Sequence, residues 1–341
     1  MVPFTSKADT RSSVTQNKDS GQFSINMKSV QNKLKYGLKI GIAKGWSGFL
    51  WMLKILVPIS LLTAIFEYSG CINKIDFLLK PGMNLLNLSP MAALPLIVGM
   101  LTGIYGGIAS MVVLPLTQNE MTLIAIFLLI SHNLIQEGII QGKSGLNPVK
   151  ATLFRLTASI ATVYIASLFL GSEPTFLVQK STSASMDPSF IMMLKAWFMA
   201  TLYLSIKIFA IIMVLMILLE MMKIFNWIHH IVKMINPLLR TMGLNRRVGI
   251  LWLTAIVFGL AYGGAVIVEE AKQEDLTRKE LEKLHLSIGI NHSMVEDPSL
   301  FLSLGLSAFW LWIPRFIMAV IAVHLFDLYY KIKLYNTRFC L

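Results

Sequence analysis

The sequence ISHNLIQE at residues 130–137 returns as INHSMVED at residues 290–297, 160 positions further along the chain. Each stretch carries a His two places after an Ile, and an acid five places after that His. Both lie in otherwise apolar sequence, where ionisable side chains are costly and by default point to function. The pair therefore indicates an internal repeat, and the rest of the chain can be aligned outward from it.

Further polar residues fall into register when the two halves are aligned. The offset drifts from 153 to 160, so three short insertions suffice. The matched sets are Lys54 with Lys207, Glu67 with Glu220, Pro81 with Pro237, Tyr105-Gly106-Gly107 with Tyr262-Gly263-Gly264, and His132, Glu137, Gly145 and Arg155 with His292, Asp297, Gly305 and Arg315. A duplicated membrane unit is the architecture of many transporters, whose substrate sites form where the two repeats meet.

The composition places the protein in a lipid bilayer. Hydrophobic residues make up 55% and charged residues 14% of the 341 positions, and the mean hydropathy is +0.66. A soluble domain carries about 25% charged residues, so an all-α polytopic membrane protein is predicted. The net charge of +12 does not indicate a nucleic-acid partner, because the basic residues flank apolar runs and there set orientation.

The apolar runs allow two ways of threading the repeat. Runs close to the roughly 20 residues that a bilayer requires lie at 47–69, 91–116, 149–170, 190–222, 247–268 and 307–330, with weaker segments at 121–146 and 284–306. If the weaker segments cross the membrane, the chain has eight spans and parallel repeats. If they are re-entrant hairpins, each half has three spans, and the repeats are inverted.

The basic residues favour the inverted arrangement. Of the 25 Lys and Arg outside the apolar runs, the hairpin model puts 18 inside and the eight-span model 16. The hairpin model places 223–247 inside and the acidic loop 269–283 outside. Each half then has three spanning helices, an amphipathic helix ending near a Pro, and a re-entrant hairpin over its His segment.

The expected domain boundaries follow from the repeat. Residues 1–45 form a polar disordered tail and, over 28–44, a basic amphipathic helix on the membrane surface. Residues 46–171 form the first repeat, 172–188 a linker, 189–332 the second repeat and 333–341 a C-terminal tail. No signal peptide is visible, because the first apolar run begins near residue 47.

Polar residues around the two His form the candidate substrate site. His132 with Gln136, and His292 with Glu296, are spaced i, i+4 and would share a face on a continuous helix. The full set is His132, Asn133, Gln136, Glu137, Asn291, His292, Ser293, Glu296 and Asp297. Facing each other near the midplane, the two clusters would make a polar pocket. The alternative is that they are loop residues wetted at one face of the membrane.

The remaining matched residues have structural interpretations. The two Tyr-Gly-Gly segments, Tyr105-Gly106-Gly107 and Tyr262-Gly263-Gly264, suit close helix packing, or a broken helix facing a ligand. Lys54, Lys207, Arg155 and Arg315 are candidate buried charge partners. Arg155 and Arg315 follow Glu137 and Asp297 by 18 residues and are expected to pair with them. The alternative is an Arg that extends to the membrane interface.

No motif indicates an enzyme or a cofactor. The chain lacks the phosphate-binding G-x-x-x-x-G-K-[ST] loop, HExxH and CxxC. Its two cysteines, Cys71 and Cys340, have no metal-ligand spacing. We therefore expect no catalytic residues and no cofactor, with the coupling ion left open.

The runs FGLAYGGAVIVEEAK (258–272) and SIGINHSMVEDPSLF (287–301) resemble the nucleoside-recognition or Gate domain. That family is related to concentrative nucleoside transporters, to the membrane part of ferrous-iron transporters and to spore-maturation membrane proteins. The resemblance is strongest over 245–310 and extends through the repeat to 90–147. It implies a multi-pass protein of the bacterial inner membrane with transport-like architecture.

Three functions remain open at this point. The leading one is a gradient-driven permease for a small polar solute, nucleoside-like by resemblance. The second is transport of a divalent metal ion, because two His and three acids supply suitable nitrogen and oxygen ligands. The third is a structural subunit of a membrane complex, with a homo-oligomer or another membrane protein as partner.

Overall fold

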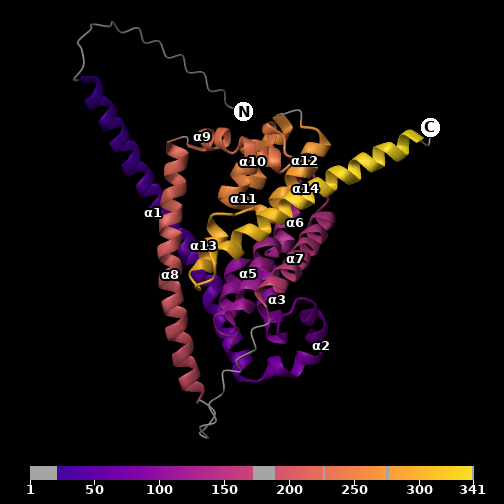
Figure 1. Ribbon diagram of the computed structural model, residues 1–341. Helices are drawn as coiled ribbons and strands as arrows, with labels where there is room; N and C mark the ends of the chain where they lie inside the picture. The colour runs from indigo at the N-terminus through magenta and orange to yellow at the C-terminus, as the bar shows by residue number, and fades with distance from the viewer. Residues whose placement is uncertain (1–20, 172–188, 226, 274–275, 340–341) are drawn as a thin grey trace, which may run out of the picture.

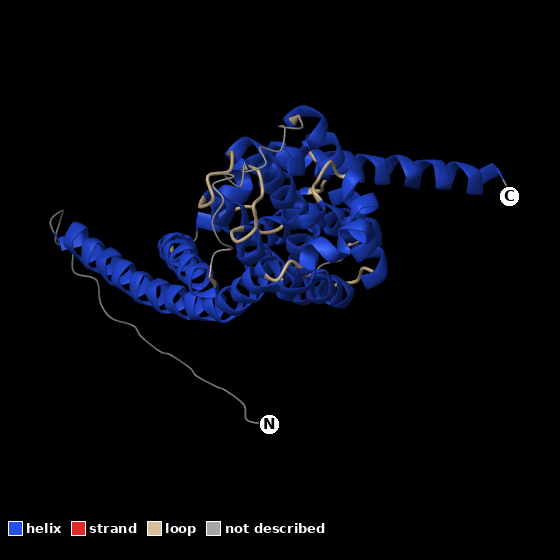
Figure 2. Ribbon diagram, turned by 90° about the horizontal axis from the view of Figure 1, so that it is seen from below, coloured by secondary structure: helices blue, strands red, loops and turns tan. Residues whose placement is uncertain are grey.

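The computed structural model describes residues 21–171, 189–225, 227–273 and 276–339, and over these ranges every regular element is a helix (Figure 2). The first half contains α1 Gly21–Tyr68, α2 Cys71–Leu85, η1 Pro90–Ala92, α3 Ala93–Thr102, α4 Ile104–Met111, α5 Gln118–Ser131, α6 Leu134–Lys143 and α7 Pro148–Leu170. The second half contains α8 Phe190–Ile224, α9 Trp227–Met234, α10 Asn236–Thr241, η2 Arg246–Val248, α11 Gly249–Gln273, α12 Arg278–Asn291, α13 Glu296–Leu302 and α14 Ala308–Phe339. Five helical segments are long and apolar enough to cross a membrane, or six if one bent pair counts as a span. The predicted all-α polytopic class is confirmed.

The two halves share backbone turns as well as sequence. Residues with positive φ recur at matched positions: Asn87 and Gly243, Gly103 and Gly259, Asn133 and Ser293, Gly145 and Gly305. Capping boxes start α5 at Thr117 and α12 at Thr277, each closed by a Glu three residues on. Such boxes satisfy two amides at a helix start. The same local chemistry therefore builds corresponding elements in each half.

The re-entrant hairpin of the first half lies in a different segment from the one predicted. Gly103 (φ 93°, ψ −175°) separates α3 from α4, and a Cβ on Gly107 would lie 3.5 Å from the Cα of Gly99 and 3.6 Å from the carbonyl oxygen of Pro95. The chain therefore folds back on itself. Helices of 10 and 8 residues reach only about 15 and 12 Å, so 91–116 is not the span that was expected.

The predicted hairpin at 121–146 is correspondingly wrong. Helices α5 and α6 together form one apolar segment, Gln118–Lys143, of 26 residues, long enough to span. The break at His132 and Asn133 interrupts this segment without reversing it. In the second half, Gly259 (φ 78°, ψ 173°) interrupts α11 at the position that matches Gly103. Three spans, an amphipathic helix and a hairpin are still found in the first half, but in a different order.

Helices α1 and α8, which correspond in the two repeats, lie side by side and run in opposite directions (Figure 1). Gly37 of α1 faces Ile224 of α8, Gly41 faces Ile217 and Gly45 faces Met213. This packing extends α1 as one helix through 28–44. The prediction of a separate amphipathic helix there is therefore wrong. Its glycines face α8, whereas the prediction required that side of the helix to face lipid.

The two ends of the bundle are distinguished by their short helices. Helix α2 lies at one end, and α9 and α10 lie at the other (Figure 1). The start of α12 packs at the α9–α10 end, because Asn245 Nδ2 donates to Glu280 Oε1 at 2.6 Å and Lys283 Nζ to the carbonyl of Gly243 at 2.8 Å. The expected separation of loop 269–283 from 223–247 is therefore wrong. The reason is the hairpin of the second half, which turns the chain back to the α9–α10 end of the bundle, where that hairpin began.

The hydrophobic core consists of two clusters that exchange residues between the halves. One is built mainly from α4 and α5, and it receives residues of the second half from α8 together with Leu300 and Phe301 of α13. The other is built mainly from α11, α12 and α14, and it receives Ile130 of α5 and Ala158 of α7. The predicted disordered tail lies outside the described residues up to residue 20, but its remainder at 21–30 is wrong, because α1 begins at Gly21. The predicted linker at 172–188 also lies outside the described residues. Helix α14 continues to Phe339, across the boundary expected at 332.

Candidate functional site

Two central helices are interrupted at matched residues. His132 ends α5 in an extended conformation (ψ 159°), and Asn133 is left-handed (φ 50°) before α6 begins. His292 (ψ 158°) and Ser293 (φ 50°) interrupt the second helix in the same way, between α12 and α13. Non-helical backbone at membrane depth is tolerated only where other groups satisfy it.

The neighbouring hairpins supply the hydrogen bonds that each break requires. The amide of Asn133 donates to the carbonyl of Gly99 in α3 at 3.1 Å. In the second half the amide of Ser293 donates to the carbonyl of Ala255 at 3.1 Å, and that of Met294 to Ile256 at 2.8 Å. Each hairpin is thus joined to the broken helix of its own repeat.

Two buried arginines satisfy the carbonyl groups at the breaks. Arg155 donates through Nε to Ile130 (2.8 Å) and through Nη2 to His132 (2.9 Å). Arg315 donates through Nε (3.1 Å) and Nη2 (2.9 Å) to Ile290, and through Nη2 to His292 (2.9 Å). Their exposures are 1% and 0%, so neither extends to the interface. The planar fork of a guanidinium suits such paired acceptors.

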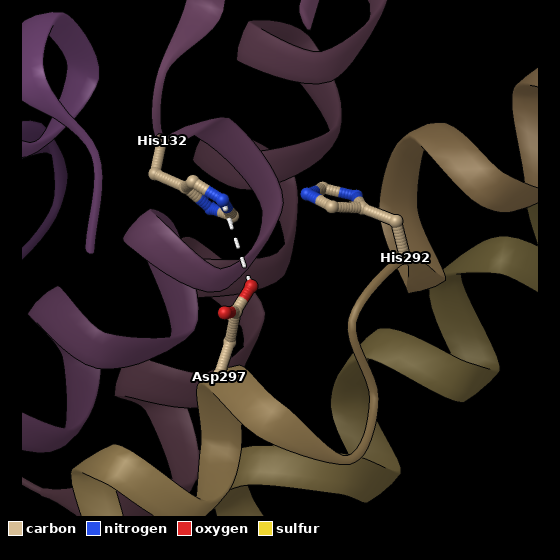
Figure 3. A group of neighbouring side chains, drawn as sticks. All are labelled: His132, His292 and Asp297. Atoms are coloured by element: carbon tan, nitrogen blue, oxygen red, sulfur yellow. Dashed lines mark ion pairs between the residues drawn. The ribbon is translucent and has the colours of Figure 1, made fainter. Parts of the chain in front are cut away.

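The two histidines and Asp297 converge at one place (Figure 3), and Glu137 lies against both histidines. His132 Nε2 lies 3.1 Å from Glu137 Oε1 and 3.5 Å from Asp297 Oδ2, and His292 Nε2 lies 3.2 Å from Glu137 Oε2. The two imidazole centroids are 5.0 Å apart. Each of these four side chains is at most 10% exposed. The cluster is therefore shared by the two halves and shielded from solvent.

Both imidazoles are oriented by backbone carbonyls. His132 Nδ1 lies 2.8 Å from the carbonyl of Leu128, and His292 Nδ1 lies 3.0 Å from that of Ile288. A carbonyl can only accept, so each Nδ1 carries the hydrogen. The Nε2 atoms are consequently turned toward the two carboxylates.

Arg155 pairs with Glu137, as the sequence predicted, with Nη1 and Oε2 2.6 Å apart. Several atoms of the cluster nevertheless make no well-aligned hydrogen bond, among them Glu137 Oε2, His292 Nε2 and Asp297 Oδ2. The expected pairing of Arg315 with Asp297 is not formed within 4 Å. Arg315 donates to the carbonyls of its own break, and its Nη1 has no hydrogen-bond partner.

The break also changes which acids join the histidines. Gln136 is exposed and accepts from Asn133, and Glu296 accepts from the Tyr105 hydroxyl at 3.1 Å. Neither lies against its His, although i, i+4 spacing had suggested so. The left-handed residue after each His rotates the following helix, so that the acid five residues on, Glu137 or Asp297, reaches the cluster.

The other predicted residues are more dispersed. Asn291 is fully buried, and its side-chain amide has no hydrogen-bond partner. Lys54 is exposed, so its assignment as a buried charge was wrong. Lys207 is half-buried and meets no carboxylate; it donates to the carbonyl of Ser303 (3.2 Å) and lies 4.4 Å from the Tyr203 ring centroid.

Close packing at the first Tyr-Gly-Gly segment involves α5. Gly106 and Gly107 are buried, and a Cβ on Gly107 would lie 2.3 Å from Leu128 Cδ1. The side-chain surroundings of the second segment, residues 262–264, lie outside the described part of the chain. The sequence reasoning missed His285, a buried residue of α12 whose Nε2 contacts the Ser144 carbonyl at 3.0 Å. The available signal was its position between Leu284 and Leu286, where α12 turns apolar.

The fold and the buried cluster define a multi-pass membrane protein with duplicated, interrupted helices. Residues 49–171 match the model of the Gate family, described as nucleoside recognition. The predicted Gate resemblance is confirmed for this segment, which covers nearly all of the first repeat. The sequence reasoning had put the strongest resemblance at 245–310 instead.

One relative covers most of the chain. Uncharacterized membrane protein YvoD of Bacillus subtilis (strain 168) is 26% identical over 286 residues, which are 82% of this chain and 91% of the relative. No solved structure matches the chain. The similarity to a membrane protein agrees with the apolar helices.

Proposed function

We propose that the protein is a permease of the bacterial cytoplasmic membrane whose transport of a small polar solute is driven by an ion or proton gradient. The solute class is nucleoside-like, on the strength of the family description matched by residues 49–171. The protein performs no catalysis in this proposal. Its partners are the bilayer and the solute.

One observation carries the proposal. Two helices are interrupted at matched residues, and their breaks bring His132 and Glu137 of one repeat against His292 and Asp297 of the other. Discontinuous helices that meet at a repeat interface are how many secondary transporters build a site near the midplane. Buried ionisable groups in such a position mark solute or ion pathways.

The proposal includes inverted repeats. The opposite directions of α1 and α8 are what this symmetry requires. Alternating access would then consist of movement of one repeat against the other, which would open the shielded cluster first to one side and then to the other.

Uptake into proteoliposomes tests the proposal. Wild-type protein should accumulate labelled nucleosides or related polar solutes when a proton or sodium gradient is imposed. His292→Ala and His132→Ala should both lose uptake, because both repeats contribute to the cluster, while remaining monodisperse. Gln136→Ala, on an exposed side chain outside the cluster, is the control and should transport as wild type does.

One combination of results would contradict the permease. If no solute is taken up or stabilises wild type, and the His variants only melt at lower temperature, the cluster holds helices together. The protein would then be a structural subunit of a membrane complex.

A further inference from the structure

We propose that His132, His292 and Asp297 bind one divalent first-row transition-metal ion, with Glu137 as the fourth ligand. The inference rests on the proposed function in one respect, that the cluster is a ligand site, and it assigns a metal ion to that site in addition to the transported solute. It is carried by the arrangement of the ligand atoms.

The separations between ligand atoms fit a tetrahedral site. Atoms bound to zinc lie about 2.0–2.2 Å from the metal, so the corners of a tetrahedron are about 3.3–3.6 Å apart. Three of the separations between candidate ligand atoms are 3.1 Å (His132 Nε2 to Glu137 Oε1), 3.2 Å (His292 Nε2 to Glu137 Oε2) and 3.5 Å (His132 Nε2 to Asp297 Oδ2), so each oxygen of Glu137 lies at such a distance from one imidazole. One ligand atom each of His132, His292 and Asp297 can be chosen so that all lie within 4.8 Å of one another. A small contraction around an ion would complete the geometry.

The imidazoles are already oriented as metal ligands usually are. A ligating His typically donates its other ring N–H to a carbonyl or carboxylate, which fixes the tautomer. Leu128 and Ile288 provide those carbonyls for His132 and His292. In each neutral ring the Nε2 lone pair then points into the cluster (Figure 3).

Two atoms at the centre lack the partner that a metal ion would supply. His292 Nε2 and Asp297 Oδ2 are buried and make no aligned hydrogen bond. A lone pair on Nε2 facing a carboxylate oxygen at 3.2 Å is repulsive unless a proton on Nε2 or a metal cation lies between them. A divalent ion removes this repulsion, and the carboxylates of Glu137 and Asp297 offset its charge.

The arginines do not fill this position. Arg155 donates through Nε and Nη2 to the carbonyls of its break, and it pairs only with Oε2 of Glu137. The other oxygen, Oε1, faces His132. Arg315 is likewise turned to the carbonyls of Ile290 and His292. Both hold the ligating segments in place from outside the ligand set.

The donor set selects the class of metal. Two imidazole nitrogens with carboxylate oxygens suit Zn²⁺, Mn²⁺, Fe²⁺, Co²⁺ or Ni²⁺. Magnesium and calcium prefer oxygen ligands and higher coordination numbers. We therefore expect Zn²⁺ and Co²⁺ to bind and Mg²⁺ not to compete.

Metal binding to the purified full-length protein tests the inference. Zn²⁺ should bind at one ion per chain by titration calorimetry and elemental analysis, and Co²⁺ should give the visible absorption of a tetrahedral site. Asp297→Asn, which keeps shape, and His292→Ala should weaken binding by more than the roughly 10–100-fold that loss of an outer partner costs.

His285→Ala is the matched control, because it removes a second buried His of the same helix, one turned to the Ser144 carbonyl. It should bind the metal as wild type does. No Zn²⁺ or Co²⁺ binding by folded wild type would overturn the inference, and so would equal loss of binding in the His285 and His292 variants. If His292→Ala fails to fold, Asp297→Asn and the cobalt spectrum decide.

The experiments distinguish failure of the metal site from failure of the proposed function. Uptake of a polar solute by a protein that binds no metal would overturn the metal site and leave the permease standing. Stoichiometric binding of Zn²⁺ without transport of metal or solute would support the site and overturn the permease. Uptake of ⁶⁵Zn²⁺ that Asp297→Asn abolishes would make the metal the cargo.

Discussion

At the scale of single residues, the two arginines determine how the breaks are maintained. Arg155 and Arg315 donate to the carbonyls that the interrupted helices leave unpaired. A guanidinium keeps its charge under all ordinary conditions, so this support does not depend on the occupant of the cluster. Arg155 has an additional role, because Glu137 pairs with it.

A double-mutant cycle on this pair should show strong coupling. Arg155→Met alone leaves the Glu137 carboxylate buried without its strongest partner and should cost about 3–5 kcal/mol. Adding Glu137→Gln removes that charge, so the double variant should be more stable than the sum of the single effects predicts. Thermal or denaturant unfolding in detergent measures all four proteins, and simple additivity would contradict the pairing.

Gly107 offers a packing test at the same scale. Gly107→Ala places a Cβ 2.3 Å from Leu128 Cδ1, and such overpacking typically costs about 1–3 kcal/mol. Gly82→Ala in α2, where nothing lies within 4 Å of the added carbon, is the control and should melt no lower than wild type, because Ala favours a helix more than Gly does. Equal melting temperatures for the two variants would show that α4 and α5 are not tightly packed.

Only some of the residues that form the site could be predicted from the sequence. The repeat selected His132, His292, Glu137 and Asp297 because matched ionisable residues in apolar sequence stand out. Helical spacing then grouped Gln136 and Glu296 with the histidines, which the structure does not do. A left-handed Asn or Ser leaves no strong signal in a single sequence, so the rotation at each break could not be foreseen.

At the scale of elements, glycine at position 103 decides where the chain turns back. Its φ of 93° with ψ near 180° is a conformation essentially confined to glycine. A Cβ there would meet nothing closer than 3.9 Å. The cost of a side chain is therefore one of backbone conformation and not of space.

Gly103→Ala should accordingly destabilise the hairpin between α3 and α4. Strained backbone of this kind costs about 1–3 kcal/mol, which a thermal shift in detergent would detect. Gly48→Ala is the comparison, because that helical glycine also has its nearest neighbour at 3.9 Å and no unusual φ. A Gly103 variant as stable as the Gly48 variant would mean that the turn tolerates any residue.

The sequence predicted the kinds of element but not their order. Hydropathy marked 91–116 as the stronger run and 121–146 as the weaker one, because His132, Gln136 and Glu137 lower the average. The stronger run is the hairpin and the weaker one the span. A segment can be apolar because it is buried in protein or because it contacts lipid, so hydropathy alone does not separate a hairpin from a span. In this chain a single glycine turn makes the stronger run a hairpin.

At the scale of the whole molecule, the corrected order of elements strengthens the prediction of how the protein is oriented in the membrane. Among the described residues, 21 Lys and Arg lie outside the apolar runs, and 19 of them lie in loops or helix ends at the α9–α10 end. Two, Lys74 and Lys80, lie at the α2 end. The positive-inside bias then predicts that the α9–α10 end faces the cytoplasm.

Cysteine labelling from outside the cell tests this orientation. With Cys340 replaced by Ser, the exposed native Cys71 at the start of α2 should react with an impermeant maleimide. In a Cys71→Ser, Cys340→Ser background, Arg240→Cys and Arg278→Cys should both be protected until the membrane is permeabilised. Labelling of the Arg278 variant from outside would restore the arrangement in which 223–247 and 269–283 lie on opposite sides.

The hydrogen bonds between each hairpin and its neighbouring break have a mechanical consequence. In the described part of the chain, backbone-to-backbone bonds outside the helices join residues of the same half, as Asn133 to Gly99 and Ser293 to Ala255 do. Contacts across the centre are made through side chains, such as Tyr105 with Glu296 and His292 with Glu137. Each hairpin and its broken helix should therefore move as one rigid body. Sliding of one body past the other exchanges side-chain partners and leaves every backbone bond intact.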